Sequence, residues 1–197
     1  MGYTLTTAPA EEPLSLDRVK EHLKVDISDD DVLIGLLIIA TRGYAEHQTG
    51  RSLVTQEWRY TCDAFPGWCD GGGAALLLEK GPFQSIDGIG YTDMGGDPAT
   101  WSPTDYVADL TGPLARIAPR FGKTWPIALP QLAAVQIDFT AGYGAAVDVP
   151  QGIKQWMLLR IGALYENREE IAVGRGIVVP SLPFVDGLLD PFSVKRV

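Results

Sequence analysis

Residues 150–170 read PQGIKQWMLLRIGALYENREE, a stretch that starts with proline, is apolar on almost every side and ends in charged residues. Proline suits the first turn of a helix, and Asp148 just ahead of it complements the positive end of the helix dipole. The pattern predicts a helix over 150–168. Because a helix that is apolar all round is buried all round, we expect neighbours on more than one of its faces.

A second long helix is predicted over 28–50. Ser28 is the expected N-cap, the run Asp29-Asp30-Asp31 complements the dipole, and Gly50 closes the helix. Its middle, VLIGLLIIA, is also apolar on all sides. A short helix capped by Ser15 is predicted over 15–24. We expect the two long helices to pack against each other.

Between these helices, residues 53–141 form short segments rich in strand-forming residues, with glycine, proline and aspartate between them. This pattern predicts a compact antiparallel β region of five or six strands. The expected strand segments are 53–62, 75–79, 85–92, 105–109, 114–118 and 133–140.

The order of elements favours an α+β fold, because runs of strands separate from helices are typical of that class. We predict a flexible N-terminal arm over 1–13 and a small helical bundle with an inserted antiparallel β region over 14–170. An extended C-terminal arm follows over 171–197. This arm has many apolar residues between proline and glycine breaks, so something must cover it. We expect it to dock on a partner, with packing on its own domain as the alternative.

Composition and charge exclude several classes of protein. The 197 residues are 46% hydrophobic and 21% charged, which excludes a chain disordered throughout. The net charge of −9 argues against a surface that grips phosphates. The two cysteines, Cys62 and Cys69, match no usual zinc pattern and are expected to be reduced. With neither a signal peptide nor a membrane-spanning run in view, we expect a soluble protein made in a cytoplasm.

No catalytic centre is predicted. Catalysis by acids and bases or by a metal needs carboxylates that converge on one cleft. The available carboxylates are Asp29-Asp30-Asp31, Asp105 with Asp109, and Glu166 with Glu169-Glu170. The triple Asp sits at a helix start, where capping explains it, and Glu169-Glu170 follows a helix end. The two histidines lie on predicted helices, and the glycine runs lack a phosphate-binding context. We therefore expect no catalytic residue, cofactor or metal ligand.

The five tryptophans leave one alternative open. Trp58, Trp68 and Trp101 lie in or beside predicted strands, where they could stack on sugar rings. A carbohydrate- or receptor-binding module is thus a rival interpretation. Their spacing indicates no shared face, however, so core or interface packing is favoured.

The two long helices predict self-assembly, because a domain of this size can hardly surround both. On the last helix, Ile153, Trp156 and Met157 belong to one stripe, while Leu158 and Leu159 occupy another face. We expect the second face to meet another copy, and identical subunits that meet through unlike faces close into a ring. The predicted subunit-interface residues are Leu37, Ile38, Trp156, Leu159, Arg160 and Arg168.

Several segments resemble one known family when their order and spacing are taken together. The run FTAGYG at 139–144 is followed by Val149-Pro150 and by a helix that ends LYENRE at 164–169. Other matching segments are LSLD at 14–17 with Val19, Lys20 and Leu23, the Asp29–Asp31 helix start that ends in Thr49-Gly50-Arg51, and Trp125-Pro126. Over about residues 14–170 the chain resembles the head–tail connector (adaptor) proteins of long-tailed phages and gene transfer agents.

The resemblance implies a structural protein without catalytic residues. Such proteins form a ring, usually of twelve copies, beneath the capsid portal, and join it to the stopper or tail-terminator protein. They extend the channel through which DNA passes without sequence-specific binding, and they act in the virion rather than at a membrane. The C-terminal segment of similar proteins reaches the portal. The expected portal-docking residues are Ile177, Val179, Leu182, Phe184, Leu188 and Phe192.

Overall fold

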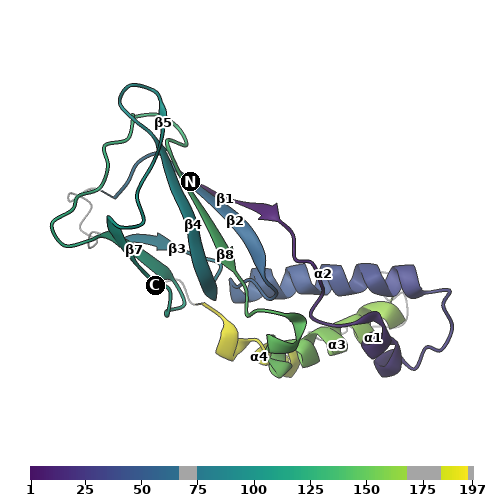
Figure 1. Cartoon of the computed structure of the whole chain (residues 1–197). Coiled ribbons are helices and arrows are strands. Elements are labelled where there is room, and N and C mark those ends of the chain that lie inside the picture. The colour runs from purple at the N-terminus through teal and green to yellow at the C-terminus, as the bar shows by residue number, and fades with distance from the viewer. Residues whose placement is uncertain (67–74, 168–182, 195–197) are drawn as a thin grey trace. The chain divides into compact units, whose positions relative to one another are not determined.

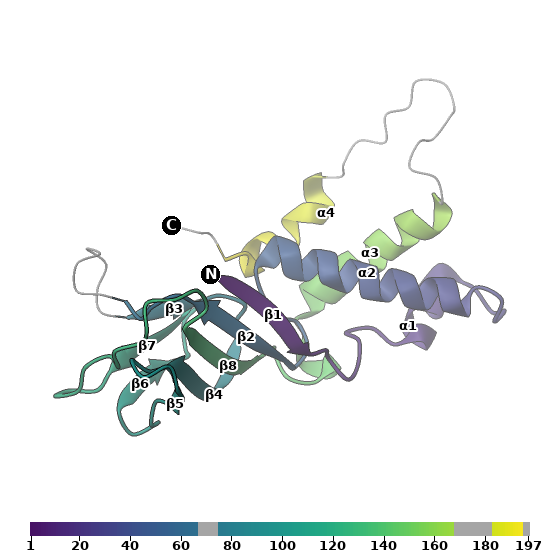
Figure 2. The ribbon, with the colours of Figure 1, turned by 90° about the horizontal axis from the view of Figure 1, so that it is seen from above.

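The computed structural model describes residues 1–66, 75–167 and 183–194. The chain folds into two compact units (Figures 1 and 2). The β unit comprises residues 1–10 and 55–143, and the helical unit comprises residues 11–54 and 144–197. The chain thus leaves the helical unit after α2 and re-enters it before α3, which confirms an α+β fold with a β region inserted between helices.

The helical unit is built around two long helices, α2 and α3, which run side by side in Figures 1 and 2. The short helix α1 packs against both of them. The predicted pairing of the two long helices is therefore confirmed. The elements of this unit are α1 (Leu16–Leu23), α2 (Asp31–Thr49), the 3-10 turn η1 (Ala146–Asp148), α3 (Gln151–Glu166), α4 (Pro183–Gly187) and the 3-10 turn η2 (Asp190–Phe192).

Local sequence explains most of the helix ends. The Ser15 hydroxyl accepts a hydrogen bond from the Arg18 backbone N–H at 3.3 Å, and so caps α1 as predicted. Gly50 ends α2 in the left-handed conformation, at φ 69°. The prediction that Ser28 caps α2 is wrong. The helix begins at Asp31 after Asp30, because the Ser28 carbonyl instead closes a turn with the Asp31 N–H.

The β unit contains two antiparallel sheets that share one core. The larger sheet has the order β1-β2-β8-β4-β5, and the smaller sheet has the order β3-β7-β6. The strands of the β unit are β1 (Gly2–Thr7), β2 (Gln56–Cys62), β3 (Leu76–Leu78), β4 (Phe83–Thr92), β5 (Pro98–Thr100), β6 (Tyr106–Asp109), β7 (Ala115–Pro119) and β8 (Val135–Ala141).

Strand β8 shows how the sequence pattern sets the register of the larger sheet. Val135, Ile137, Phe139 and Ala141 alternate with more polar residues, and all four are buried. Because side chains of a strand point to alternate faces, these four residues lie on the core face of the sheet. Phe139 pairs with Trp58 of β2 on one side and with a residue of β4 on the other.

Two strands differ from the sequence prediction. Residues 2–7, predicted as part of a flexible arm, form the edge strand β1 and pair with β2. Tyr3 holds this strand in place: its ring packs on Tyr60 at 4.9 Å, and its hydroxyl accepts the Glu79 N–H at 2.8 Å. Strand β5 was also not predicted, because three residues at a turn carry too short a pattern.

Candidate interaction surfaces of the helical unit

One face of α2 is apolar and open to solvent. Val32, Leu36 and Ile39 follow one another at helical spacing and are 78%, 59% and 48% exposed. Gly43 continues the same row, and a Cβ atom added there would meet nothing within 4 Å. We call Val32, Leu36, Ile39 and Gly43 the α2 stripe. It lies opposite the buried face of the helix, which is formed by Ile34, Ile38, Thr41, Ala45 and Thr49.

Helix α3, by contrast, is covered by its own chain. Its buried residues are Ile153, Trp156, Met157, Leu158 and Ile161. Trp156 is fully buried, and its ring stacks on Tyr44 of α2 with centroids 5.7 Å apart. The indole N–H of Trp156 donates to Asp186 of α4 at 3.3 Å, and the Arg160 guanidinium lies over the rings of both Trp156 and Tyr44.

The C-terminal segment 183–194 provides part of this cover. Leu189 is buried in the helical unit, and α4 contacts α3. Two backbone contacts hold the end of the segment: the Val194 N–H donates to the Thr49 carbonyl at 2.9 Å, and Arg51 donates to the Phe192 carbonyl at 2.6 Å. Residues 183–194 of the predicted arm thus pack on their own unit.

The predicted interface residues fall into three groups. Leu37, Leu159 and Arg160 are partly exposed, so they can contact a neighbour. Ile38 and Trp156 are only 3% and 0% exposed, which leaves them no surface to offer to another subunit. Their place in the core follows from the packing of α2 on α3 and α4. The remaining residue of the prediction, Arg168, lies outside the described residues.

Of the predicted portal-docking residues, Leu188 and Phe192 are described. Both are partly buried, and the Phe192 ring and the Leu188 carbonyl lie beside Gly152 of α3. Their docking on a portal stays a prediction. The side chains of the other four lie outside the described part of the structure: Ile177, Val179, Leu182 and Phe184.

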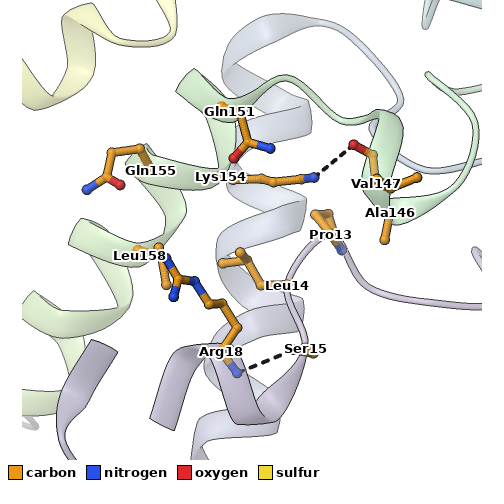
Figure 3. Close-up of a pocket in the computed structure, with 10 residues that line it drawn as sticks. All are labelled: Pro13, Leu14, Ser15, Arg18, Ala146, Val147, Gln151, Lys154, Gln155 and Leu158. Atoms are coloured by element: carbon orange, nitrogen blue, oxygen red, sulfur yellow. Dashed lines mark hydrogen bonds between the residues drawn. The ribbon is translucent and has the colours of Figure 1, made fainter. Parts of the chain in front are cut away.

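A cavity of about 350 Å³ opens between α1, η1 and α3 (Figure 3). We call it the α3 pocket. The Arg18 and Lys154 side chains reach it, and the Lys154 ammonium donates to the Val147 carbonyl at 3.1 Å. Its lining residues are Pro13, Leu14, Ser15, Arg18, Ala146, Val147, Gln151, Lys154, Gln155 and Leu158. No signal in the sequence predicted this pocket, because the fold brings together segments that lie far apart along the chain.

Several of the candidate catalytic carboxylates have structural partners. Asp30 accepts a hydrogen bond from the Tyr165 hydroxyl, and Asp31 pairs with Lys20 at 2.6 Å. Asp109 accepts from Thr111 and pairs with Arg116, and these contacts lower its pKa to about 2. Within residues 1–66, 75–167 and 183–194, no three His, Cys, Asp or Glu side chains are placed to hold a metal ion.

Two further findings concern the cysteine and the membrane. Cys62 is a free, buried thiol, and burial raises its pKa. Cys69 lies outside the described residues. None of the described helices is both long and apolar enough to cross a bilayer.

The described tryptophans of the β unit do not form a stacking platform for sugars. Trp101 is only 6% exposed and packs against Phe65, Tyr106 and Trp125 within the core. Trp58 lies on another strand, under the Lys80 ammonium. Trp68 is not among the described residues. The carbohydrate-binding alternative is therefore unsupported.

Comparison with known proteins gives one family match. Residues 13–67 match the model of the phage gp6-like head–tail connector protein family. This range contains α1, α2, the α2 stripe and strand β2. No curated protein matches the chain.

Solved structures give a likeness over the whole chain. A chain in the virion of a native gene transfer agent particle has a TM-score of 0.80 at 22% identity, and the alignment covers 100% of this protein and 97% of that chain. Chains from the neck of the empty particle, computed with C6 symmetry, and from the neck of the native particle, computed with C12 symmetry, have TM-scores of 0.79 and 0.74, with the same identity and coverage. The family match over 13–67 and the shared fold confirm the resemblance to phage head–tail connector proteins.

Proposed function

We propose that this protein is a structural head–tail connector of a virion, which assembles as a ring at the head–tail junction and extends the DNA channel. The observation that carries the proposal is the agreement of two independent comparisons. The segment 13–67 matches a head–tail connector family, and the fold of the whole chain matches proteins of a gene transfer agent neck. A net charge of −9 suits a channel wall that DNA passes without binding.

The α2 stripe supports assembly of several copies. A neighbouring copy that covers this row of large apolar residues would remove their surface from water. Burial of apolar surface stabilises a complex by about 25 cal/mol per Å². Gly43 adds room for close approach, because its position is open in the single subunit. We infer that the stripe contacts an adjacent copy, together with the exposed parts of Leu37, Leu159 and Arg160.

The ring also has a number of copies and two neighbouring proteins. We propose that the ring has twelve copies, and that it binds the portal on one side and the stopper or tail-terminator protein on the other. The C12 symmetry with which the neck of the native gene transfer agent particle was computed supports the number of copies. Docking of the C-terminal segment on the portal remains part of this proposal.

Electron microscopy of the purified protein, alone and mixed with its portal, tests the assembly directly. We expect rings in at least one of the two samples, because the portal provides a circular template. A protein that forms no ring and never joins the portal would contradict the connector function.

The Gly43→Trp variant tests the role of the α2 stripe. Because no atom of the described residues lies within 4 Å of an added Cβ, a side chain at position 43 can extend into solvent, and the thermal unfolding temperature of the subunit should not fall. The same indole would block a closely packed neighbour and prevent ring formation. Gly43→Ala is the matched control and should assemble normally. If Gly43→Trp formed normal rings, the α2 stripe would not be part of the subunit interface.

A further inference from the structure

We propose that the α3 pocket of one subunit receives the loop between α1 and α2 of a neighbouring copy. This inference rests on the proposed ring, and it specifies the contact that orients each subunit head to tail with the next. The acceptor is the α3 pocket, and the donor is the segment 25–29, VDISD, which we call the α1–α2 loop.

The pocket is positively charged in a negatively charged protein. Arg18 and Lys154 line it, and no aspartate or glutamate of the described residues does so, although the chain carries a net charge of −9. The ion pair of Arg18 with Glu21 is highly exposed and therefore weak, so the guanidinium is available to another carboxylate. The walls also contain Leu14, Val147 and Leu158. Such a site suits a segment with both carboxylates and an apolar side chain.

The α1–α2 loop has this composition. Asp26 and Asp29 are exposed, and Ile27 between them is 60% exposed. The loop carries no lysine or arginine. A cavity of about 350 Å³ is near the lower end of the range for small-ligand pockets, and so it can hold one or two side chains of this size.

The positions of donor and acceptor suit head-to-tail assembly. The loop leads directly into the α2 stripe, so the two surfaces form one continuous donor face. The pocket is lined by residues 13–18 and 146–158, none of which belongs to α2. Figure 3 shows the pocket with α2 behind the residues that line it. A subunit whose donor and acceptor surfaces are different faces makes heterologous contacts, which form a ring when the rotation from one copy to the next closes.

Charge reversal tests the pairing. The pocket variant carries Arg18→Glu and Lys154→Glu, and the loop variant carries Asp26→Lys and Asp29→Lys. Glutamate at position 18 lies three residues after the Ser15 cap, and glutamate at 154 lies in the first turn of α3, so both suit their helices. Asp30 and Asp31 remain at the start of α2. All variants are compared by analytical ultracentrifugation at low salt and by electron microscopy, with thermal unfolding as the check of folding.

Each variant alone should associate at least about tenfold more weakly than the wild type, because like charges then face each other at every junction. A single chain with all four changes should regain assembly. A 1:1 mixture of the two variants should also assemble, because alternating copies pair native loop with native pocket and reversed loop with reversed pocket. The control Arg120→Glu with Lys123→Glu alters the net charge as much as the pocket variant and should assemble like the wild type.

Two results would overturn the pairing. In the first, wild-type rings form and both variants assemble as well as the wild type. In the second, neither the four-change chain nor the mixture recovers assembly, which would show that the loop and the pocket do not contact each other. In both cases the wild-type rings remain, so the proposed connector function is unaffected. Failure of that function has a different signature, namely no wild-type ring with or without the portal.

Discussion

Helices α2 and α3 look alike in sequence and differ in their surroundings. Both carry apolar residues on all sides, and they pack against each other. On α3, a segment from the far end of the chain covers a further face, through Asp186 and Leu189. On α2, the stripe from Val32 to Gly43 stays exposed. A helix that is apolar all round thus needs cover, but only the fold decides whether the same chain or another copy supplies it.

The difference assigns the two helices to different tasks. Helix α3 belongs to the core of the subunit, because five of its large side chains, Ile153, Trp156, Met157, Leu158 and Ile161, are buried within the chain itself. Helix α2 joins the core by one face and presents the other for assembly. Changes at the buried residues of α3, such as Trp156, should therefore alter the stability of the single subunit, whereas changes on the α2 stripe should alter association.

The largest expected effect is that of Trp156→Ala. Removal of a fully buried tryptophan costs about 3–5 kcal/mol in the free energy of unfolding. Leu36→Ala on the exposed stripe is the control and should change that free energy by no more than about 0.5 kcal/mol. Urea unfolding of the monomer measures both values. Equal losses for the two variants would contradict the division between the helices.

Asp186→Ala tests the cover that the C-terminal segment gives to α3. Asp186 accepts the Trp156 N–H and lies 3.6 Å from Arg160. Its side chain is half exposed, so we expect a loss of about 1 kcal/mol in unfolding free energy. The control Asp190→Ala, in the same segment, should lose less. A loss as large for Asp190→Ala would mean that Asp186 does not hold the segment in place.

Two glycines compare the open and covered faces directly. Gly43→Ala should stabilise the monomer by about 0.5–1 kcal/mol, because alanine favours the helix and the site is open. Gly152→Ala on α3 should gain less or lose stability, because the new Cβ would lie 3.1 Å from the Phe192 ring. Thermal unfolding of both variants provides the measurement. Equal gains would show that Phe192 does not pack on α3 in solution.

The smallest effect should come from acid, at Asp109 of the β unit. Hydrogen bonds from Thr111 lower the pKa of Asp109 to about 2, from a usual value of 3.8. Since the folded state holds the carboxylate charged, its contribution to stability is present above pH 3.8 and is lost as the pH falls toward 2. An NMR titration of Asp109 tests this, with Thr111→Val as the comparison. A pKa near 3.8 in the wild type would contradict it.

Much of the fold could be predicted because its signals are local. The Ser15 side chain caps the start of α1, and the left-handed backbone of Gly50 ends α2. The alternation of Val135, Ile137 and Phe139 sets the core face of β8. Strand β1 could not be predicted, because Gly2–Thr7 carries little periodic pattern and is held by Tyr3 across the sheet. Local signals could not predict which apolar residues stay exposed, and two of the predicted interface residues, Ile38 and Trp156, lie in the core.

Spacing and composition alone were enough to predict the α+β class, the two long apolar helices and the resemblance to head–tail connectors. These features depend on patterns that act over a few residues at a time. Two others required the folded chain: which apolar face remains open, and that Arg18 and Lys154 share one pocket. Such contacts join segments far apart in the chain. The energies of these contacts depend on how the whole unit packs, and this packing cannot be predicted from local sequence patterns.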